Sequence, residues 1–483
     1  MSSSEAQSHG GTDGTDAEEQ GGVRVTAVLI HSSRFPHTAN MTRPSSFACI
    51  VGLAASFVAG PLAAQALSPD PRIHSLLDQI SPERLESNLQ VLTSFETRHT
   101  LSALRDSAGW GIRAAREWIL GEFETYSPRL ESRLDCYRIP AQGERITSEV
   151  ELCNVMAILP GRSPRRVYVS GHFDSLARIP GQQGFDWERW DNFAPGANDD
   201  GSGTVLTMEL ARVIAQSDLE FDATLVFIAL AGEEEGLVGA RLHAQRAVRD
   251  SIRIDAVFNN DIIGNSVGGN GIVDSRTVRV FAQGPEDSPS RHLARFIRRH
   301  AALYVPGHQV RLIGREDRFG RGGDHTAFNQ LGYAGVRFSE SRENYSRQHT
   351  VDDTIDGVDF EYLARNARVN AAGVLTVALA PAAPVVSGRF GPRLGRGESG
   401  YDAVLEWEHS PGAAGYRIFW REAWTPDWEH ELYVGDVTEY TLPDISIDDY
   451  IFGVAAVGSR GHESLVTPYV RPPRGNTEVQ EIR

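Results

Sequence analysis

Apolar runs that end in polar residues are the main feature of the middle of the chain. Residues 225–230, LVFIAL, have the length and the apolar, β-branched character of a buried parallel strand. The run stops at Gly232 and is followed by three carboxylates, Glu233, Glu234 and Glu235. Like charges at the end of a buried strand are unfavourable unless a cation or a proton stabilises them. The pattern therefore indicates either a metal site or a solvated acidic loop.

The same alternation of apolar segments and polar turns predicts layers of helices and strands. Apolar residues recur at helical spacing in segments between 67 and 130. Short apolar segments at 167–169, 256–258 and 335–338 are typical of buried strands. We therefore expect an α/β catalytic domain over residues 67–380. It would have three layers, with a mixed, largely parallel sheet flanked by helices.

After a linker rich in Pro and Ala, the period of the pattern changes to two. Tyr416, Ile418 and Trp420 alternate with charged residues. Short segments of this kind, separated by Gly, Pro and Asp turns, predict an all-β sandwich over residues 384–472. Residues 473–483 have the composition of a disordered tail.

The N-terminal pattern predicts export to the periplasm or the cell exterior. Residues 1–40 are rich in Ser, Gly, Thr and acidic residues at the start and show no sustained period, which is typical of disorder. Residues 41–66 combine a positive charge, an apolar run and a small-x-small cleavage site, which are the three parts of a secretory signal peptide. We therefore expect translation to begin at Met41, with residues 1–40 an upstream extension of the gene model. The mature chain would begin at Leu67, and the short run, broken by Pro61, would leave no stable membrane span.

Composition and charge narrow the class of protein. Charged residues make up 23% of the 483 residues and hydrophobic residues 41%, which fits a globular protein with a sizeable core. The formal net charge of -17 argues against nucleic acid as a partner. Of the three cysteines, Cys49 lies in the signal segment. Cys136 and Cys153 lie in strand-like segments, and in an oxidising compartment we expect a disulfide between them rather than two free thiols.

Candidate metal ligands follow the predicted strands or open the predicted helices. They are His172, Asp199, Glu234, Asp261 and His349. Each alone has an ordinary explanation, such as a loop histidine or a helix cap. In open α/β sheets, however, ligands gather at the carboxyl ends of the strands. Two histidines and three carboxylates suit zinc and are too many for one tetrahedral ion, so the set predicts two ions that share a carboxylate.

The chain also carries five ordered motifs between residues 94 and 379: GHFDS, GANDDGSG, GEEEGL, NND and HTVDDT. This series resembles the di-zinc aminopeptidase superfamily, which includes glutamate carboxypeptidases and glutaminyl cyclases. The resemblance implies that His172 and His349 bind one zinc ion each and that Asp199 bridges the two. Glu234 and Asp261 would complete the two sites.

The resemblance also implies an activity, the hydrolysis of N-terminal residues from peptides by a metal-bridged hydroxide. Glu233 would be the general base, and Asp174 would orient the histidine two residues before it. Tyr345 is a candidate donor to the oxyanion. An insertion with Trp187 and Trp190 departs from the family pattern and leaves the shape of the substrate pocket open.

Several related activities remain as alternatives. A carboxypeptidase or dipeptidase could use the same metal core, and a glutaminyl cyclase-like enzyme would use one zinc ion. A non-catalytic binding scaffold is disfavoured, because a scaffold has no need of a general base at Glu233.

The C-terminal segment carries a resemblance of its own. Trp407, Tyr416, Leu442 and Tyr450 resemble the core pattern of fibronectin type III domains. Such a module could hold the enzyme near a surface or pack against the catalytic domain, and the sequence identifies no partner for it.

Overall fold

The structure, a computed structural model, describes residues 67–471. The predictions for residues 1–40, for the signal peptide at 41–66 and for the tail at 473–483 lie outside the described residues. Within the described part of the chain, no helix is both long and apolar enough to cross a membrane.

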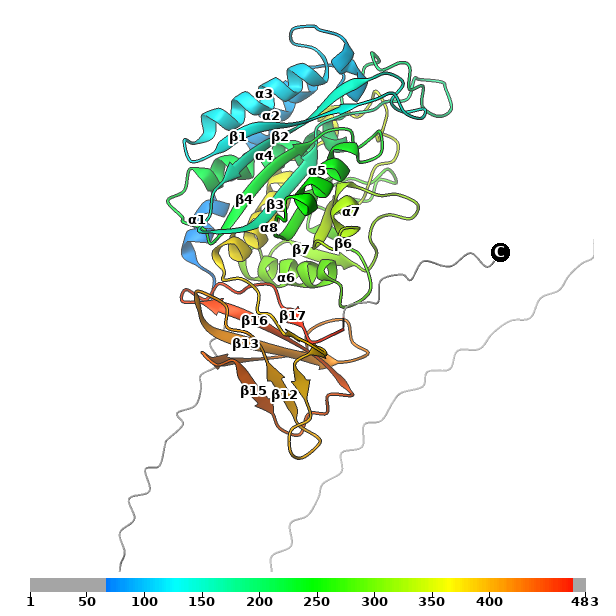
Figure 1. Cartoon of the computed structure of the whole chain (residues 1–483). Helices are drawn as coiled ribbons and strands as arrows, with labels where there is room; N and C mark the ends of the chain where they lie inside the picture. The colour runs from blue at the N-terminus through cyan, green and yellow to red at the C-terminus, as the bar shows by residue number, and fades with distance from the viewer. Residues whose placement is uncertain (1–66, 472–483) are drawn as a thin grey trace, which may run out of the picture. The chain divides into compact units, whose positions relative to one another are not determined.

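Helices and strands alternate through the first three quarters of the described chain (Figure 1). The helices are α1 (Pro71–Leu77), α2 (Pro82–Thr93), α3 (Gly111–Tyr126), α4 (Ser202–Ala215), α5 (Val238–Arg249), α6 (Pro289–Tyr304), α7 (Asp324–Asn329) and α8 (Phe360–Leu379). The strands are β1 (Glu131–Ile139), β2 (Val150–Leu159), β3 (Ser163–His172), β4 (Ala223–Leu230), β5 (Ile254–Asn260), β6 (Thr277–Ala282), β7 (Gln309–Ile313) and β8 (Gly335–Glu340). Short helical turns are η1 (Thr100–Leu104), η2 (Ala197–Gly201) and η3 (Ile355–Gly357).

The eight strands form one sheet in the order β1-β2-β4-β3-β5-β8-β6-β7. The four central strands, β4, β3, β5 and β8, run parallel to one another. β2 pairs antiparallel with β4, and β6 pairs antiparallel with β8. The parallel centre brings the carboxyl ends of four strands to one edge, which is where loops can assemble a site.

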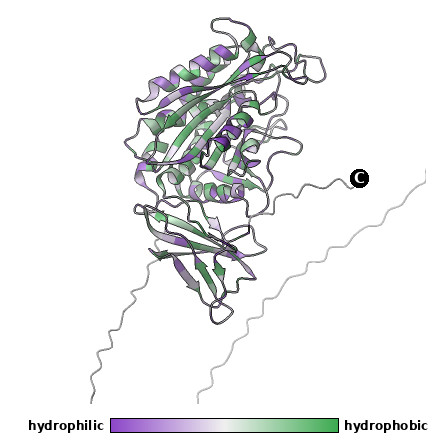
Figure 2. Cartoon of the chain, viewed as in Figure 1, coloured by the Kyte–Doolittle hydropathy of each residue, from purple (hydrophilic) through white to green (hydrophobic). Residues whose placement is uncertain are grey.

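Both faces of the sheet are covered by helices, which confirms the three-layer prediction. On β4, Leu225 and Phe227 face a large apolar cluster with α2, α3, α4, α6 and α8. The alternate residues Val226 and Ile228 face a smaller cluster with α5 and α7. Successive residues of β4 point to opposite faces of the sheet, and both faces are covered by apolar residues. The sequence of β4 is therefore a continuous hydrophobic run. In Figure 2 the central strands are accordingly coloured as mostly hydrophobic.

The C-terminal part is an antiparallel β-sandwich, as predicted. Its strands are β9 (Ser387–Gly388), β10 (Gly391–Pro392), β11 (Leu394–Gly395), β12 (Ala403–Glu406), β13 (Ala413–Glu422), β14 (His430–Gly435), β15 (Glu439–Leu442), β16 (Tyr450–Gly458) and β17 (Thr467–Pro468). β11-β12-β15 and β14-β13-β16-β17 form two sheets that share a core with Leu405, Ile418 and Val454. Arg421 donates to both carboxylate oxygens of Asp287, at 2.7 and 2.9 Å. The likeness to fibronectin type III domains stays a prediction.

Cys136 on β1 and Cys153 on β2 face each other in the antiparallel register and form a disulfide. The two cysteines are 17 residues apart in sequence, and closing a loop of this size stabilises a folded protein by about 2–4 kcal/mol.

We predict that the double variant Cys136→Ser/Cys153→Ser lowers the free energy of unfolding by about 2–3 kcal/mol. The reason is that the unfolded chain regains the freedom that the crosslink removes. Guanidinium unfolding of the oxidised protein and of the variant would measure the difference. The original protein in reducing agent should behave like the variant, and equal midpoints for oxidised protein and variant would contradict the prediction.

Candidate metal centre

The five candidate ligands converge at the carboxyl edge of the parallel strands. His172 ends β3, Asp261 directly follows β5, and Glu234 lies in the loop after β4. Asp199 lies in η2, ahead of α4, and His349 lies in the segment after β8. These elements are distant in sequence, and only the sheet order brings their ends together.

Asp199 is shared between two groups of three potential ligands. Its Oδ1 lies 3.3 Å from His172 Nε2, which is in turn 4.0 Å from Asp261 Oδ1. Its Oδ2 lies 3.0 Å from His349 Nε2, which is also 3.0 Å from Glu234 Oε1. Within each group, the potential ligand atoms all lie within 4.8 Å of one another. One carboxylate with an oxygen in each group is the arrangement that two bridged ions require.

The donor chemistry of these groups fits zinc. Each group combines one imidazole nitrogen with two carboxylate oxygens, which are zinc ligands. Asp199 Oδ2 and Glu234 Oε1 are buried and have no hydrogen-bond partner among the described residues. Buried polar atoms are normally satisfied. Both oxygens lie 3.0 Å from His349 Nε2. A cation bound between these three atoms would satisfy the two oxygens.

Burial controls the electrostatics of the site. Desolvation raises the pKa of the Glu233 carboxyl well above its usual range, although His172 opposes the shift. Burial would also raise the pKa of Asp199, but His349 and His172 hold it well below its usual range. The two carboxyls therefore differ in proton affinity, and Glu233 holds a proton more readily than Asp199 does.

The three consecutive glutamates have three different environments. Glu233 lines an open cleft and Glu234 belongs to one ligand group. Glu235 turns the other way, and its Oε2 accepts a hydrogen bond of 2.6 Å from Thr100. Burial raises the pKa of Glu235 to about 8. The three glutamates are therefore not all potential metal ligands, and they do not form a solvated acidic loop.

Asp174 lies beside both predicted neighbours. His172 Nδ1 is 3.2 Å from the backbone oxygen of Asp174 and 3.5 Å from its Oδ1. Asp174 Oδ2 accepts from the backbone N–H of Glu234 at 3.0 Å. The Asp174 carboxylate therefore makes two contacts: it holds the loop after β4 in place, and it lies beside the imidazole ring of His172.

Two further aspartates position the ligands and were not singled out from the sequence. Asp353 Oδ2 accepts from the backbone N–H of Asp199 at 3.0 Å. Asp200 Oδ2 accepts from the backbone N–H of His172 at 3.0 Å. Both belong to quoted motifs, GANDDGSG and HTVDDT, so the excess of acid in those motifs was the available signal.

A buried arginine, also missed from the sequence, supports Asp261. Arg337 Nη2 donates to Asp261 Oδ1 at 2.8 Å, and Nη1 donates to Asp317 Oδ2 at 3.0 Å. Arg337 lies in the middle of β8 and is fully buried. A charge within an apolar strand is rarely buried without a partner, so this position was a detectable signal.

A cleft of about 490 Å³ opens beside the ligand groups, and Glu233 and His349 line it. Trp187 lines the same cleft, whereas Trp190 packs on the domain, with its ring 6.3 Å from that of Trp110. The two tryptophans of the insertion therefore have different roles, one at the cleft and one in packing.

The structure does not bring Tyr345 to this cleft. Its side chain is 63% exposed and lines a separate depression with Arg342. Its neighbour Glu343 is buried and pairs with Arg279 and Arg318, which fixes this segment with Tyr345 outward. This placement gives no support to an oxyanion role for Tyr345.

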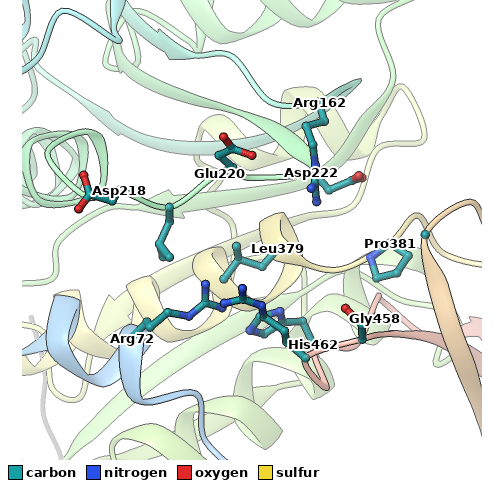
Figure 3. Close-up of a pocket in the computed structure, with 13 residues that line it drawn as sticks. Arg72, Arg162, Asp218, Glu220, Asp222, Leu379, Pro381, Gly458 and His462 are labelled. Carbon is teal, nitrogen blue, oxygen red and sulfur yellow. The ribbon is translucent and has the colours of Figure 1, made fainter.

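Another pocket, of about 360 Å³, lies elsewhere (Figure 3). Arg72, Asp222 and Leu379 of the α/β domain line it together with Gly458 and His462 of the sandwich. It contains none of the candidate ligands, and its charges have both signs.

Comparison with known proteins identifies the family. Residues 154–374 match the family described as Peptidase family M28. A probable zinc metalloprotease of Pyricularia oryzae is 38% identical in an alignment of 440 positions, gaps included, that covers 83% of this chain and 84% of that relative. The chain belongs to peptidase family M28. This M28 protein is therefore a zinc metallopeptidase, as the motif series predicted.

Another curated relative and one solved structure are also similar to this chain. A probable zinc metalloprotease of Pyrenophora tritici-repentis is 37% identical to the M28 protein in an alignment of 431 positions, gaps included, that covers 82% of this chain and 86% of the relative. The crystal structure of LapB from Legionella pneumophila matches with a TM-score of 0.50 and 23% identity. That match covers 65% of this chain and 76% of LapB, and it shows a shared fold alone.

We predict that Asp199→Ala removes most of the bound zinc, because the two ligand groups share this residue. Loss of a residue that only supports a ligand weakens metal binding about 10- to 100-fold, so loss of a shared ligand should weaken it further. Metal analysis by mass spectrometry after dialysis would measure the zinc content. Glu124→Ala, an exposed carboxylate of α3, is the control and should keep its zinc. An unchanged zinc content in Asp199→Ala would contradict the prediction that the two ligand groups share this residue.

Proposed function

We propose that this M28 peptidase is an exported di-zinc exopeptidase that removes N-terminal residues from peptides. The observation that carries the proposal is the shared Asp199, with one oxygen directed at each of two histidines. His172, Asp199 and Asp261 would hold one ion, and Asp199, Glu234 and His349 the other. When bound, zinc would supply Lewis acidity that polarises a carbonyl and acidifies water.

Glu233 is proposed as the general base. Potential ligand atoms of Glu233, His172 and Glu234 lie within 4.8 Å of one another, so its carboxylate can reach a water at the site. A catalytic base works best when its pKa approaches the working pH, and burial moves the pKa of Glu233 in that direction. Its carboxylate would take the proton from water and later pass it to the leaving amine. Asp174 would hold His172 and the loop that carries Glu233.

The size of the cleft supports a short substrate. A volume of about 490 Å³ lies in the range of pockets that enclose ligands of drug size. Such a pocket suits one or two residues at a chain end. The choice of the N-terminal end rests on the motif resemblance, and a carboxypeptidase or dipeptidase is the alternative.

Export is proposed on two grounds. Residues 41–66 have the three parts of a signal peptide. The disulfide between Cys136 and Cys153 suits an oxidising compartment. N-terminal sequencing of the exported protein should begin at Leu67, and a mature chain that retains residues before Met41 would reject this view.

We predict that Glu233→Gln keeps its zinc and loses about 10²- to 10⁴-fold in kcat, the contribution typical of general acid-base catalysis. Zinc analysis and steady-state kinetics on the same preparation would test this. Glu235→Gln is the matched control. The Glu235 side chain turns away from the ligand groups, and a glutamine oxygen at this position can still accept the hydrogen bond from Thr100. Full activity in zinc-loaded Glu233→Gln would reject the assigned role.

A panel of aminoacyl anilides, each with and without an N-acetyl cap, tests the activity itself. An aminopeptidase should cleave only the uncapped members, and a chelator should abolish the cleavage. If a protein that holds two zinc ions cleaves neither form, the result would reject an aminopeptidase and favour the carboxypeptidase or dipeptidase alternative.

A further inference from the structure

An aromatic wall borders the cleft beside the candidate ligands. Phe185 and Trp187 come from the insertion, and their ring centroids are 5.4 Å apart. The Phe185 ring is also 5.4 Å from the ring of His349, edge to face. The insertion therefore reaches the metal ligands and forms part of the surface that a substrate would touch.

Two arginines pack on this wall. The Arg145 guanidinium lies 5.2 Å from the Trp187 ring centroid, and the Arg178 guanidinium lies 5.6 Å from that of Phe185. Stacking on aromatic faces orients a guanidinium without using its N–H donors. Phe185 and Trp187 therefore present two cations at the cleft.

Backbone contacts tie both arginines to the segments that carry the ligands. Arg145 Nη1 donates to the backbone oxygen of Glu234 at 3.1 Å. The backbone N–H of Arg178 donates to the backbone oxygen of His349 at 2.9 Å. A third arginine, Arg321, lines the cleft from the loop before α7. Three arginines thus line the cleft that Glu233 and His349 also line.

None of these three arginines forms an ion pair with a carboxylate of residues 67–471, although other arginines of this region do. Arg337 pairs with Asp261, and Arg318 pairs with Glu343. The chain has 64 acidic and 47 basic side chains, so acidic partners are abundant. A guanidinium offers five donors in a planar fork that matches a carboxylate. Arg145 and Arg178 each donate to one backbone oxygen, of Glu234 at 3.1 Å and of Gln348 at 3.5 Å, and all three arginines are exposed.

We infer that Arg145, Arg178 and Arg321 bind a carboxylate of the peptide substrate, so that the enzyme favours peptides with a carboxylate close to the scissile bond. The inference rests on the proposed function and names the substrate class for it. The carboxylate could be an acidic side chain or the free C-terminus of a very short peptide. Both sources offer the same two oxygens, and a charge-assisted pair of this kind is shorter and stronger than a neutral hydrogen bond.

Matched peptide pairs test the inference and identify the source. The first pair is a dipeptide with a free C-terminus and its amide. The second pair has Asp or Asn as the second residue of a dipeptide amide, and the third has Asp or Asn as the first residue. We expect the carboxylate member of at least one pair to show about tenfold higher kcat/KM with zinc-loaded protein. The pair that shows the preference identifies the source.

Arg178→Gln and Arg321→Gln should each reduce that preference several-fold, with zinc content and the rate on the neutral member retained. Arg133→Gln, an exposed arginine of β1 outside the cleft, is the matched control and should keep the preference. Equal kcat/KM within every pair would overturn the inference while the peptidase activity stands. A preference that survives in both variants would also overturn it.

A binding measurement can test the arginine site independently of the proposed aminopeptidase activity. Calorimetric titration of zinc-loaded Glu233→Gln with the same pairs needs no turnover. About tenfold tighter binding of the carboxylate member would support the arginine site even if the anilide panel rejected an aminopeptidase. Equal binding within every pair would reject the arginine site in either case.

Discussion

The site depends on one carboxylate held between two histidines. Asp199 has one oxygen near His172 and the other near His349; Asp199 and His172 are buried, and His349 is partly buried. Because a buried carboxylate is stable only with compensating charge or hydrogen bonds, its backbone must be held accurately. Asp353 provides this by accepting from the backbone N–H of Asp199. β3 then places His172 at the edge of the sheet, and the segment after β8 brings His349 to the other oxygen of Asp199.

Much of the fold and of the ligand set could be predicted from the sequence, because strand ends and ligands are adjacent along the chain. The apolar run of β4 leads directly to Glu234, and that of β5 leads to Asp261. The zinc metallopeptidase class and the three-layer fold follow from such local patterns, and both are confirmed. The period of two after residue 384 likewise predicted the sandwich.

The remaining parts depend on contacts between distant positions, which periodicity does not encode. Arg337 meets Asp261 across 76 positions, and Asp353 meets Asp199 across 154. The insertion was identified from the sequence, but its two tryptophans could not be separated. Only the folded loop shows that Trp187 faces the cleft and that Trp190 packs on the core. Tyr345 shows the reverse case, since proximity in sequence to His349 did not place it at the cleft.

The disulfide lies at one edge of the large sheet, since within residues 67–471 β1 pairs only with β2. An edge strand exposes unpaired backbone groups, and it is the strand that a foreign chain or a protease can engage first. Cys136 joins this edge covalently to Cys153 near the middle of β2. β1 therefore cannot detach over its whole length while the bond persists. For an enzyme proposed to be exported, this crosslink would slow cleavage at one edge of the sheet by keeping β1 attached to its neighbour.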